Sequence, residues 1–382
     1  MKYPGLGTLG VFPNELLMAI IAFTVDPPLP LESQDFDEQV YPPALLLAFY
    51  THTQLARIRL AHVSRAVAAL ILPALYGYVW LHRRGHARRL ATTLLLHPTR
   101  ALFIRRLDID TTLGGHRPDV MQTSGLDVRN VIDAIADARG SLPAGLDTYV
   151  DRRATYVNVG DPRVQCPAIL TRLVHAAGRV LRRAHLTVYT DPGRGHWMTN
   201  LMPLNDAHGL EILELDLGLL LPCELPAATV AEEYIAGGGP VLTLERMRQL
   251  EIILPMDSQI ANSGLELLAR CYFSALTALR LLGGVPGTAT TGLLAFLAVH
   301  GGRIASLELG EPVAVAPVPV VISSILNVSR LALNDLATVS ALPRLEHLIC
   351  TVSRVHALPH PLFASGHPTV KTLGFKVRAK KP

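Results

Sequence analysis

Two histidines near the C-terminus, His356 and His360, have the four-residue spacing that places two imidazoles on one face of a helix, where they could bind zinc. Pro359 and Pro361 disfavour a helix at this point, because proline lacks a backbone N–H group and clashes with the preceding turn. No third ligand is evident in the sequence. The pattern therefore predicts no metal site.

Glycines and carboxylates suggest two other kinds of chemistry. The glycines at 237–239 and 283–284 lack the Gly-x-Gly-x-x-Gly or Walker-type context that binds phosphate, and no Gly-x-Ser-x-Gly sequence presents a nucleophile. Glu214, Asp216 and Glu251 could share one face of a sheet as a general acid and base, but solvated carboxylates are the more common outcome. We expect no catalytic residue, no metal and no cofactor, with a paired acid and base as the alternative.

The composition predicts a folded protein with an aliphatic core, because 49% of its 382 residues are hydrophobic and only 5% are aromatic. The net charge of +4 is small, and the basic run at residues 82–89 has no interleaved stacking aromatics, so we expect no nucleic-acid partner. Four widely spaced cysteines form no disulfide framework, which is typical of a reducing compartment. The longest uncharged run, residues 312–327, is short and contains prolines. We expect no membrane partner and a cytoplasmic or nuclear location.

One pattern recurs from about residue 100: an apolar residue, two variable residues, a leucine, one variable residue and a second apolar residue. Any amphipathic strand can produce one match, but ten matches, most of them 24 to 29 residues apart, are typical of leucine-rich repeats. The central residues of the ten copies are Leu107, Val157, Leu186, Leu213, Leu250, Leu279, Leu307, Leu331, Leu348 and Leu373.

The pattern also predicts how the repeats pack. The central leucine and the apolar residue two positions later point to the same side of a strand. No single repeat can bury that side alone, so neighbouring repeats stack and share a core. The intervening segments 167–183, 264–275 and 291–301 are helical in pattern. We therefore predict an α/β fold over residues 81–382: a curved leucine-rich repeat solenoid with parallel strands on its concave side and helices on its convex side.

The first 80 residues follow a different pattern. Pro13 and Glu15 suit the first turn of a helix, and apolar residues follow at helical spacing up to residue 23. Residues 26–43 carry five prolines and several acidic residues but no basic residue, which predicts an acidic loop. Helical patterns resume at 44–50 and 54–67. We predict a three-helix module over residues 1–80, with 26–43 as an insertion.

This module resembles an F-box, especially that of F-box proteins from basidiomycete fungi. The resemblance is carried by Pro-Asn-Glu-Leu-Leu at 13–17, by Leu-Ala-His-Val-Ser-Arg at 60–65 and by Leu-Pro-Ala-Leu-Tyr at 72–76. The sequence departs from the family in two places. Phe12 stands where leucine is usual, and the acidic insertion at 26–43 interrupts the module. The resemblance implies docking to the Skp adaptor, and so to a cullin, in an SCF-type ubiquitin ligase. The adaptor-binding residues that it implies are Pro13, Leu16, Leu17, Ile20, Ile21, Val63 and Ser64.

An F-box protein of this kind would hold an unknown substrate protein on its repeats. Residues that flank the central leucines should point outward on the concave side. Tyr189 and Arg280 are the expected anchors, because tyrosine and arginine are enriched at interaction hot spots. The expected substrate-binding residues are His185, Tyr189, Glu214, Asp216, Glu251, Arg280, Glu308, Arg330 and Asn334.

Two other functions compete with a non-catalytic substrate receptor. In the first, the N-terminal helices only cap the solenoid of a binding or scaffold protein, since terminal repeats need a cap. The second and more distant alternative is an enzyme. Binding to the Skp adaptor separates the receptor from the scaffold, and a bound cofactor or metal would favour the enzyme.

Overall fold

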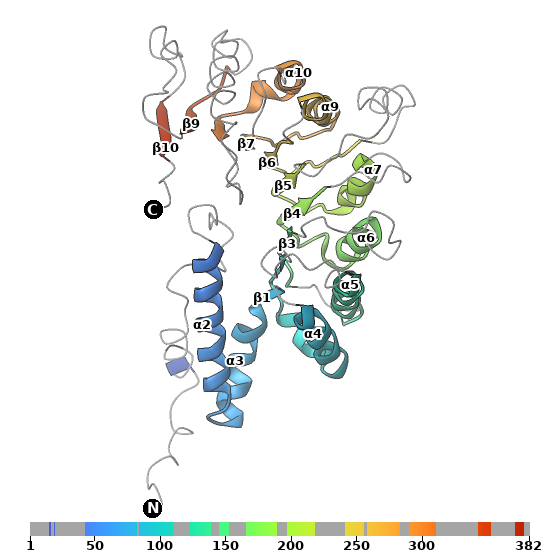
Figure 1. Cartoon of the computed structure of the whole chain (residues 1–382), viewed down its shortest axis with the longest axis vertical. Coiled ribbons are helices and arrows are strands. Elements are labelled where there is room, and N and C mark those ends of the chain that lie inside the picture. Colours follow the sequence, from blue (N-terminus) through green and yellow to red (C-terminus); the bar gives the residue numbers. More distant parts are fainter. Residues whose placement is uncertain are drawn as a thin grey trace, which may run out of the picture.

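The chain folds into a mixed α/β structure built on an open sheet of parallel strands (Figure 1). The computed structural model describes residues 15–16, 19, 43–81, 84–110, 122–138, 145–152, 166–188, 197–217, 241–255, 258–282, 290–310, 343–352 and 371–377.

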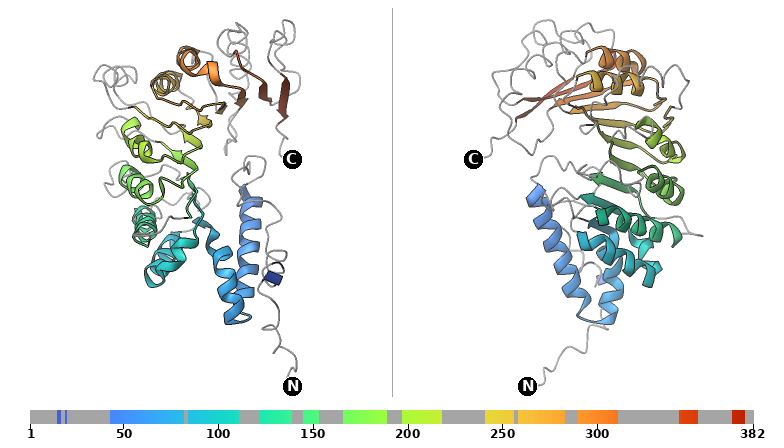
Figure 2. Two further views of the ribbon diagram at one scale, coloured as in Figure 1. Left: turned by 180° about the vertical axis from the view of Figure 1, so that it is seen from behind. Right: turned by 45° about the vertical axis from the view of Figure 1, so that its right-hand side comes forward.

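The ten strands that the structure describes form one sheet in which each strand pairs in parallel with the next one in the sequence. The sheet curves, and its first and last strands do not meet (Figure 2). The strands are β1 (Tyr78–Leu81), β2 (Arg106–Asp110), β3 (Thr148–Arg152), β4 (Arg183–Thr187), β5 (Ile212–Asp216), β6 (Gln249–Ile253), β7 (Ala278–Leu282), β8 (Ser306–Gly310), β9 (His347–Val352) and β10 (Thr372–Val377).

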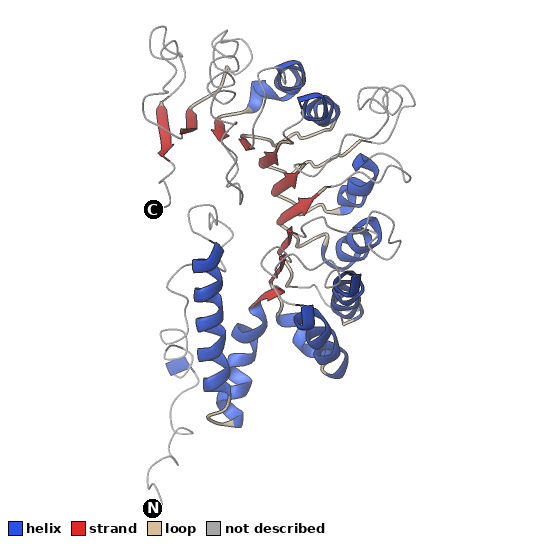
Figure 3. Cartoon of the chain, in the orientation of Figure 1, coloured by secondary structure: helices blue, strands red, loops and turns tan. Residues whose placement is uncertain are grey.

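Helices from α4 to α10 lie along the outer face of this curved sheet, whereas α2 and α3 stand at its N-terminal end (Figure 3). The contacts between neighbouring helices follow sequence order, as they do between neighbouring strands. The helical elements are α2 (Pro43–Ala61), α3 (Arg65–Gly77), α4 (Arg84–Leu96), η3 (Pro98–Phe103), α5 (Gln122–Asp137), α6 (Cys166–Ala177), α7 (Trp197–Leu201), η6 (Met202–Asp206), α9 (Ser258–Ala269), α10 (Thr290–His300) and η7 (Gly301–Arg303).

Rows of aliphatic side chains between the sheet and the outer helices form the core. Leu213, Leu250, Leu279, Leu307 and Leu348 lie in register on five successive strands, and each is buried. These central leucines are therefore buried on adjacent strands, as the repeat pattern predicts. Fully burying a leucine is worth about 1.5–3 kcal/mol, so a row of this kind contributes strongly to the stacking of the units.

Backbone hydrogen bonds at the start of each strand also join neighbouring units. The carbonyl oxygen of Arg105 accepts from the N–H groups of both Asp147 and Thr148, at 2.9 and 3.1 Å. The same double acceptance recurs one unit further on, where the carbonyl of Asp147 accepts from Arg182 and Arg183. It continues along the sheet to the carbonyl of Glu346. Stacking therefore satisfies the polar backbone of the turns as well as burying apolar side chains.

Two predicted repeat copies have no counterpart among the described strands. The strand next to β2 is β3, with Tyr149 in register with Leu107, and not the predicted copy around Val157. β3 does not match the leucine pattern, because Tyr149 stands in the central position and Asp151 in the second apolar position. β8 pairs directly with β9. Val157 and Leu331 both lie outside the described residues.

The predicted register of β4 is wrong by two residues. Ala184, and not Leu186, pairs with the central Leu213, and Leu186 pairs with Leu215. The small Ala184 occupies the same row as the large Tyr149 of the neighbouring strand. Large and small side chains in adjacent positions keep the packing volume nearly constant, which a search for leucine alone does not detect.

The predicted boundary at residue 80 falls inside β1. α3 ends at Gly77 and β1 begins at Tyr78, so no linker separates the N-terminal helices from the sheet. Val67 and Ile71 of α3 are buried against Leu60 and other residues of the helical pair. The helical pair is therefore continuous with the first strand of the array.

Replacing Gly292 with alanine should destabilise the fold by about 1–3 kcal/mol, the usual cost of overpacking. A Cβ atom at this position of α10 would meet the backbone of Asn262 in α9, whose side chain also accepts a hydrogen bond of 2.9 Å from the Gly292 N–H. Urea unfolding measures the change. Gly302→Ala is the control, because nothing lies within 4 Å of its Cβ position. Equal stability of the two variants would contradict the close approach of α9 and α10.

Candidate functional site

The candidate site is a row of charged side chains on the strand face opposite the outer helices. His185, Glu214, Glu251, Arg280 and Glu308 lie in register on β4 to β8. Each flanks a central apolar residue, so it points away from the core. We call these five residues together with Arg183 the ionic row.

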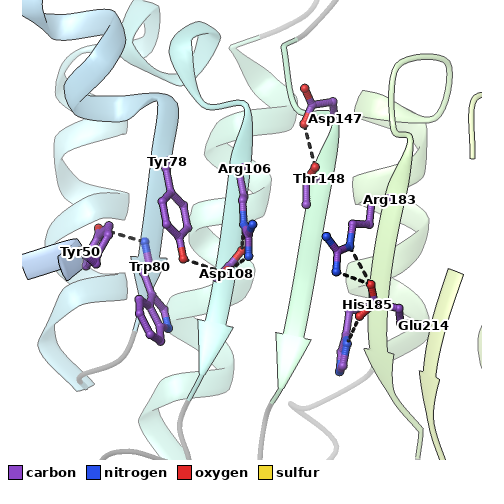
Figure 4. A network of polar contacts seen from close by, with 10 residues as sticks. All are labelled: Tyr50, Tyr78, Trp80, Arg106, Asp108, Asp147, Thr148, Arg183, His185 and Glu214. Carbon is purple, nitrogen blue, oxygen red and sulfur yellow. Dashed lines mark hydrogen bonds and ion pairs between the residues drawn. The ribbon is translucent and has the colours of Figure 1, made fainter. Parts of the chain in front are cut away.

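Ion pairs and hydrogen bonds connect the ionic row from strand to strand. Nε of Arg183 donates to Oε1 of Glu214 at 2.7 Å, and Nδ1 of His185 lies 2.7 Å from Oε2 of the same carboxylate (Figure 4). Arg280 bridges the other two carboxylates: its Nη1 donates to Glu251 at 3.0 Å, and its Nε lies 3.1 Å from Glu308. The row thus consists of two ion-paired groups, with Glu214 and Glu251 adjacent at their junction.

The carboxylates of the ionic row are buried, and this corrects the expectation that they would be solvated. Glu251 is only 3% exposed. Burial is the main cause that raises its pKa to about 7, followed by the negative charge of Glu214, while Arg280 and His185 act in the opposite direction. Neighbouring strands lie about 4.8 Å apart, so side chains of one row cover one another.

At the N-terminal end of the sheet the same face is covered by α2. The ring of Tyr50 meets those of Tyr78 and Trp80 edge-on, with centroids 5.1 and 5.6 Å apart. The backbone N–H of Trp80 donates to the Tyr50 hydroxyl at 3.0 Å, and Nε2 of Gln54 donates to the backbone carbonyl of Tyr78 at 3.2 Å. β1 is an edge strand, whose backbone groups need partners outside the sheet. α2 supplies partners for two of them.

A buried ion pair lies beside this contact. Arg106 donates to Asp108 through Nε and Nη2, at 2.8 and 2.7 Å, and the Tyr78 hydroxyl donates to the same carboxylate at 2.9 Å (Figure 4). The guanidinium of Arg106 lies over the Tyr78 ring, 4.8 Å from its centroid. α2 and this network therefore occupy the face of β1 and β2, and the ionic row begins on β4.

The remaining predicted site residues differ in exposure and in role, and several lie outside the described residues. Asp216 continues β5 beyond Glu214 and is half-buried. Leu16 and Val63 are 45% and 52% exposed. The Ser64 hydroxyl accepts from the Val67 N–H at 3.1 Å and so caps α3, a structural role. Tyr189, Arg330, Asn334, Pro13, Leu17, Ile20 and Ile21 lie outside the described residues.

Sequence reasoning missed Arg183, Arg106 and Asp108. Arg183 escapes the leucine pattern because that pattern puts Leu186, and not Ala184, in the central position of β4. Arg106 and Asp108 lie beside Leu107, at positions where the pattern accepts any residue. The alternation of polar and apolar residues along each strand could have revealed them. Each lies two residues from another polar residue on the same side of its strand.

Opposite charges pair within the ionic row. Its carboxylates are held by arginine or histidine side chains, and no group of histidine, cysteine or carboxylate residues that could hold a metal occurs among the described residues. Cys271 is buried, and burial raises its pKa to about 12, so its thiol is a poor nucleophile. Among the described helices, none is long and apolar enough to cross a membrane.

Comparison with known proteins gives no assignment: no protein-family model matches the chain, and no curated protein matches its sequence.

Replacing Tyr50 with phenylalanine should lower the free energy of unfolding by about 1–3 kcal/mol, because the buried backbone N–H of Trp80 loses its hydroxyl acceptor. Chemical unfolding gives the free energy, and hydrogen exchange at the Trp80 amide should become faster. Tyr272→Phe removes a hydroxyl from a side chain that is 51% exposed and serves as the control. Unchanged exchange at Trp80 would show that α2 does not protect the edge strand.

Glu251→Gln should reduce the pH dependence of stability. The folded-state pKa of Glu251 is raised from 4.5 to about 7, so between these values the folded protein keeps a proton that the unfolded chain releases. The free energy of unfolding of the wild type therefore falls as pH rises through this window, by up to about 3 kcal/mol from this group. The variant should lack this fall when unfolding is measured at pH 5 and pH 8, values on either side of about 7.

The matched control for this measurement is Glu346→Gln, which removes an exposed carboxylate paired with Lys371 at 2.9 Å. It should keep the wild-type fall. A Glu251→Gln variant with the same pH profile as the wild type would contradict the raised pKa.

Proposed function

We propose that the protein is a substrate-receptor subunit of an SCF-type ubiquitin ligase, with an F-box that docks to the Skp adaptor and a leucine-rich repeat solenoid that binds the substrate protein. The single observation that carries the proposal is the direct attachment of an N-terminal helical pair to an array of parallel strands stacked in sequence order.

The sheet supports the repeat half of the proposal. Each strand pairs with its sequence neighbour, the central leucines form one buried row, and the helices follow the strands along one face. These are the properties of stacked repeats whose units contact only their neighbours. The other face carries the ionic row, which gives a protein partner a patterned charged surface.

Exposed apolar residues on the N-terminal helices support the F-box half. Leu55 and Ile58 share one face of α2 and are 49% and 42% exposed, and Val63 follows in the turn to α3. Apolar side chains exposed in this number on one small element are typical of a surface that a partner covers. The residues of the F-box resemblance at 60–65 form this turn.

The contact of α2 with β1 gives the proposal a mechanism. A ubiquitin ligase receptor accelerates transfer by holding its substrate near a second catalytic subunit, so the angle between its two binding surfaces matters. Here Tyr50, Gln54 and the aromatic side chains of β1 join the two parts without a linker. Substrate on the sheet face that carries the ionic row would be held in a fixed orientation relative to the adaptor.

The same contact favours a second function. α2 covers an edge strand, and the end of a repeat array requires such a cap whether or not an adaptor binds. A repeat-based scaffold protein with capping helices is therefore the second candidate.

Leu16→Asp combined with Val63→Asp should weaken binding to a purified fungal Skp adaptor at least about a hundredfold. Each apolar side chain contributes about 1.5–3 kcal/mol when a partner buries it, and a buried unpaired charge adds a penalty. Isothermal titration calorimetry measures the affinity, and a circular dichroism melt checks that the variant is folded.

The control variant carries Leu294→Asp and Val299→Asp on α10, at positions 42% and 56% exposed, and should bind the adaptor like the wild type. Failure of the wild type to bind the adaptor at micromolar concentration would reject the ligase proposal and leave the capped scaffold. Undiminished binding by the folded Leu16/Val63 variant would reject the assigned docking surface.

A further inference from the structure

The outer face of α4 combines arginines with the most exposed leucines among the described residues. Leu95 and Leu96 are 68% and 71% exposed, and the next residues in the chain, His97 to Thr99, are exposed as well. Arg88 and Arg89 are exposed about two turns earlier on the same helix. The opposite side of α4 is buried: Ala87, Ala91 and Leu94 pack into the core. We call the exposed residues 88, 89, 92, 95 and 96 the α4 face.

The stretch of sequence that contains α4 carries only positive charge, whereas the neighbouring α5 carries Asp133 and Asp137, which lie within ion-pair distance of Arg172. From residue 39 to residue 107 the chain contains ten arginines and no aspartate or glutamate. Arg59, Arg65 and Arg105 of this stretch are exposed, like the arginines of α4. Within the described residues, Arg88 and Arg89 form no ion pair. Their charge is therefore available to a partner.

The arginines and the leucines of the α4 face lie at different positions along the helix axis. Seven residues of helix, from Arg88 to Leu95, correspond to about 10 Å. If the C-terminal end of α4 points toward a bilayer, Leu95 and Leu96 reach the boundary of the acyl chains while the arginines stay at the level of the phosphates. Interfacial helices are buried to about this depth, 5–10 Å, and gain affinity from anionic lipids.

Other partners fit the α4 face less well. Nucleic acid would use the arginines but gain nothing from two protruding leucines, and the α4 face offers no aromatic side chain on which a base could stack. Two aliphatic side chains that protrude from a convex helix need either a matching pocket or a surface that deforms around them. A lipid surface meets that requirement without shape complementarity.

We propose that the α4 face is a peripheral binding site for anionic lipid membranes. The site is separate from the proposed substrate surface, because α4 lies on the outer layer of the array, opposite the ionic row. It requires no membrane-spanning helix: the arginines contact anionic headgroups and the two leucines insert.

The test uses the full chain and sedimentation with vesicles of phosphatidylcholine containing about one-third phosphatidylserine, at about 0.1 M salt. The wild type should bind these vesicles, bind pure phosphatidylcholine vesicles far more weakly, and dissociate at about 1 M salt. Leu95→Ser with Leu96→Ser should weaken binding at least about tenfold. Arg88→Gln with Arg89→Gln should weaken it about 25-fold, since each basic residue near an anionic surface contributes about fivefold.

Matched controls change the same residue types elsewhere. Leu294→Ser with Val299→Ser removes two exposed apolar side chains from α10, and Arg246→Gln with Arg248→Gln removes two exposed charges near β6. Both should bind like the wild type. Absence of wild-type binding to the anionic vesicles overturns the proposal, and so does binding that persists in both α4 variants. Loss of binding in the arginine variant alone, together with tight binding of the wild type to a single-stranded RNA oligonucleotide, would overturn it in favour of nucleic acid.

Discussion

Each unit of this protein depends on its neighbours, because a strand of about five residues cannot bury its apolar side alone. Leu250 is fully buried, with Leu213 and Leu279 on either side of it in the sheet. The backbone repeats this dependence, since a carbonyl before one strand accepts two N–H groups from the next unit. Stability therefore spreads along the array from neighbour to neighbour, and the ends of the array need covers of a different kind.

The cover at the N-terminal end combines apolar packing with hydrogen bonds. Tyr50 supplies an aromatic ring to Tyr78 and Trp80 and a hydroxyl to the backbone of β1. The Arg106–Asp108 pair beside it is buried and fully hydrogen-bonded, which makes it costly to break by removing one partner. The helical pair and the array consequently behave as one structure, and the surface left for a partner starts beyond β2.

The sequence predicted the parts of the fold that repeat and missed those that depend on a single contact. Leu213, Leu250, Leu279 and Leu307 each stand in the same local apolar pattern, 37, 29 and 28 residues apart, so the row is visible without the structure. β3 escaped because Tyr149 replaces the leucine and its hydroxyl donates to Asp151, 3.1 Å away, where an apolar residue was expected. The docking of α2 joins residues about 30 positions apart and leaves no local pattern. Burial of the ionic row arises between strands, so no single strand reveals it.

Burial also gives the residues of the ionic row a different role from those at the ends of the same strands. Glu214 and Glu251 are 5% and 3% exposed and already hold arginine or histidine partners, so a ligand could reach them only by breaking those pairs. Thr187 and Asp216, one step further along β4 and β5, are half-buried and present more surface. The buried carboxylates therefore fix the shape and charge of the face, and contact with a partner falls to the ends of the strands. Substitutions at those ends should change partner choice with little effect on folding, whereas substitutions in the row itself change both.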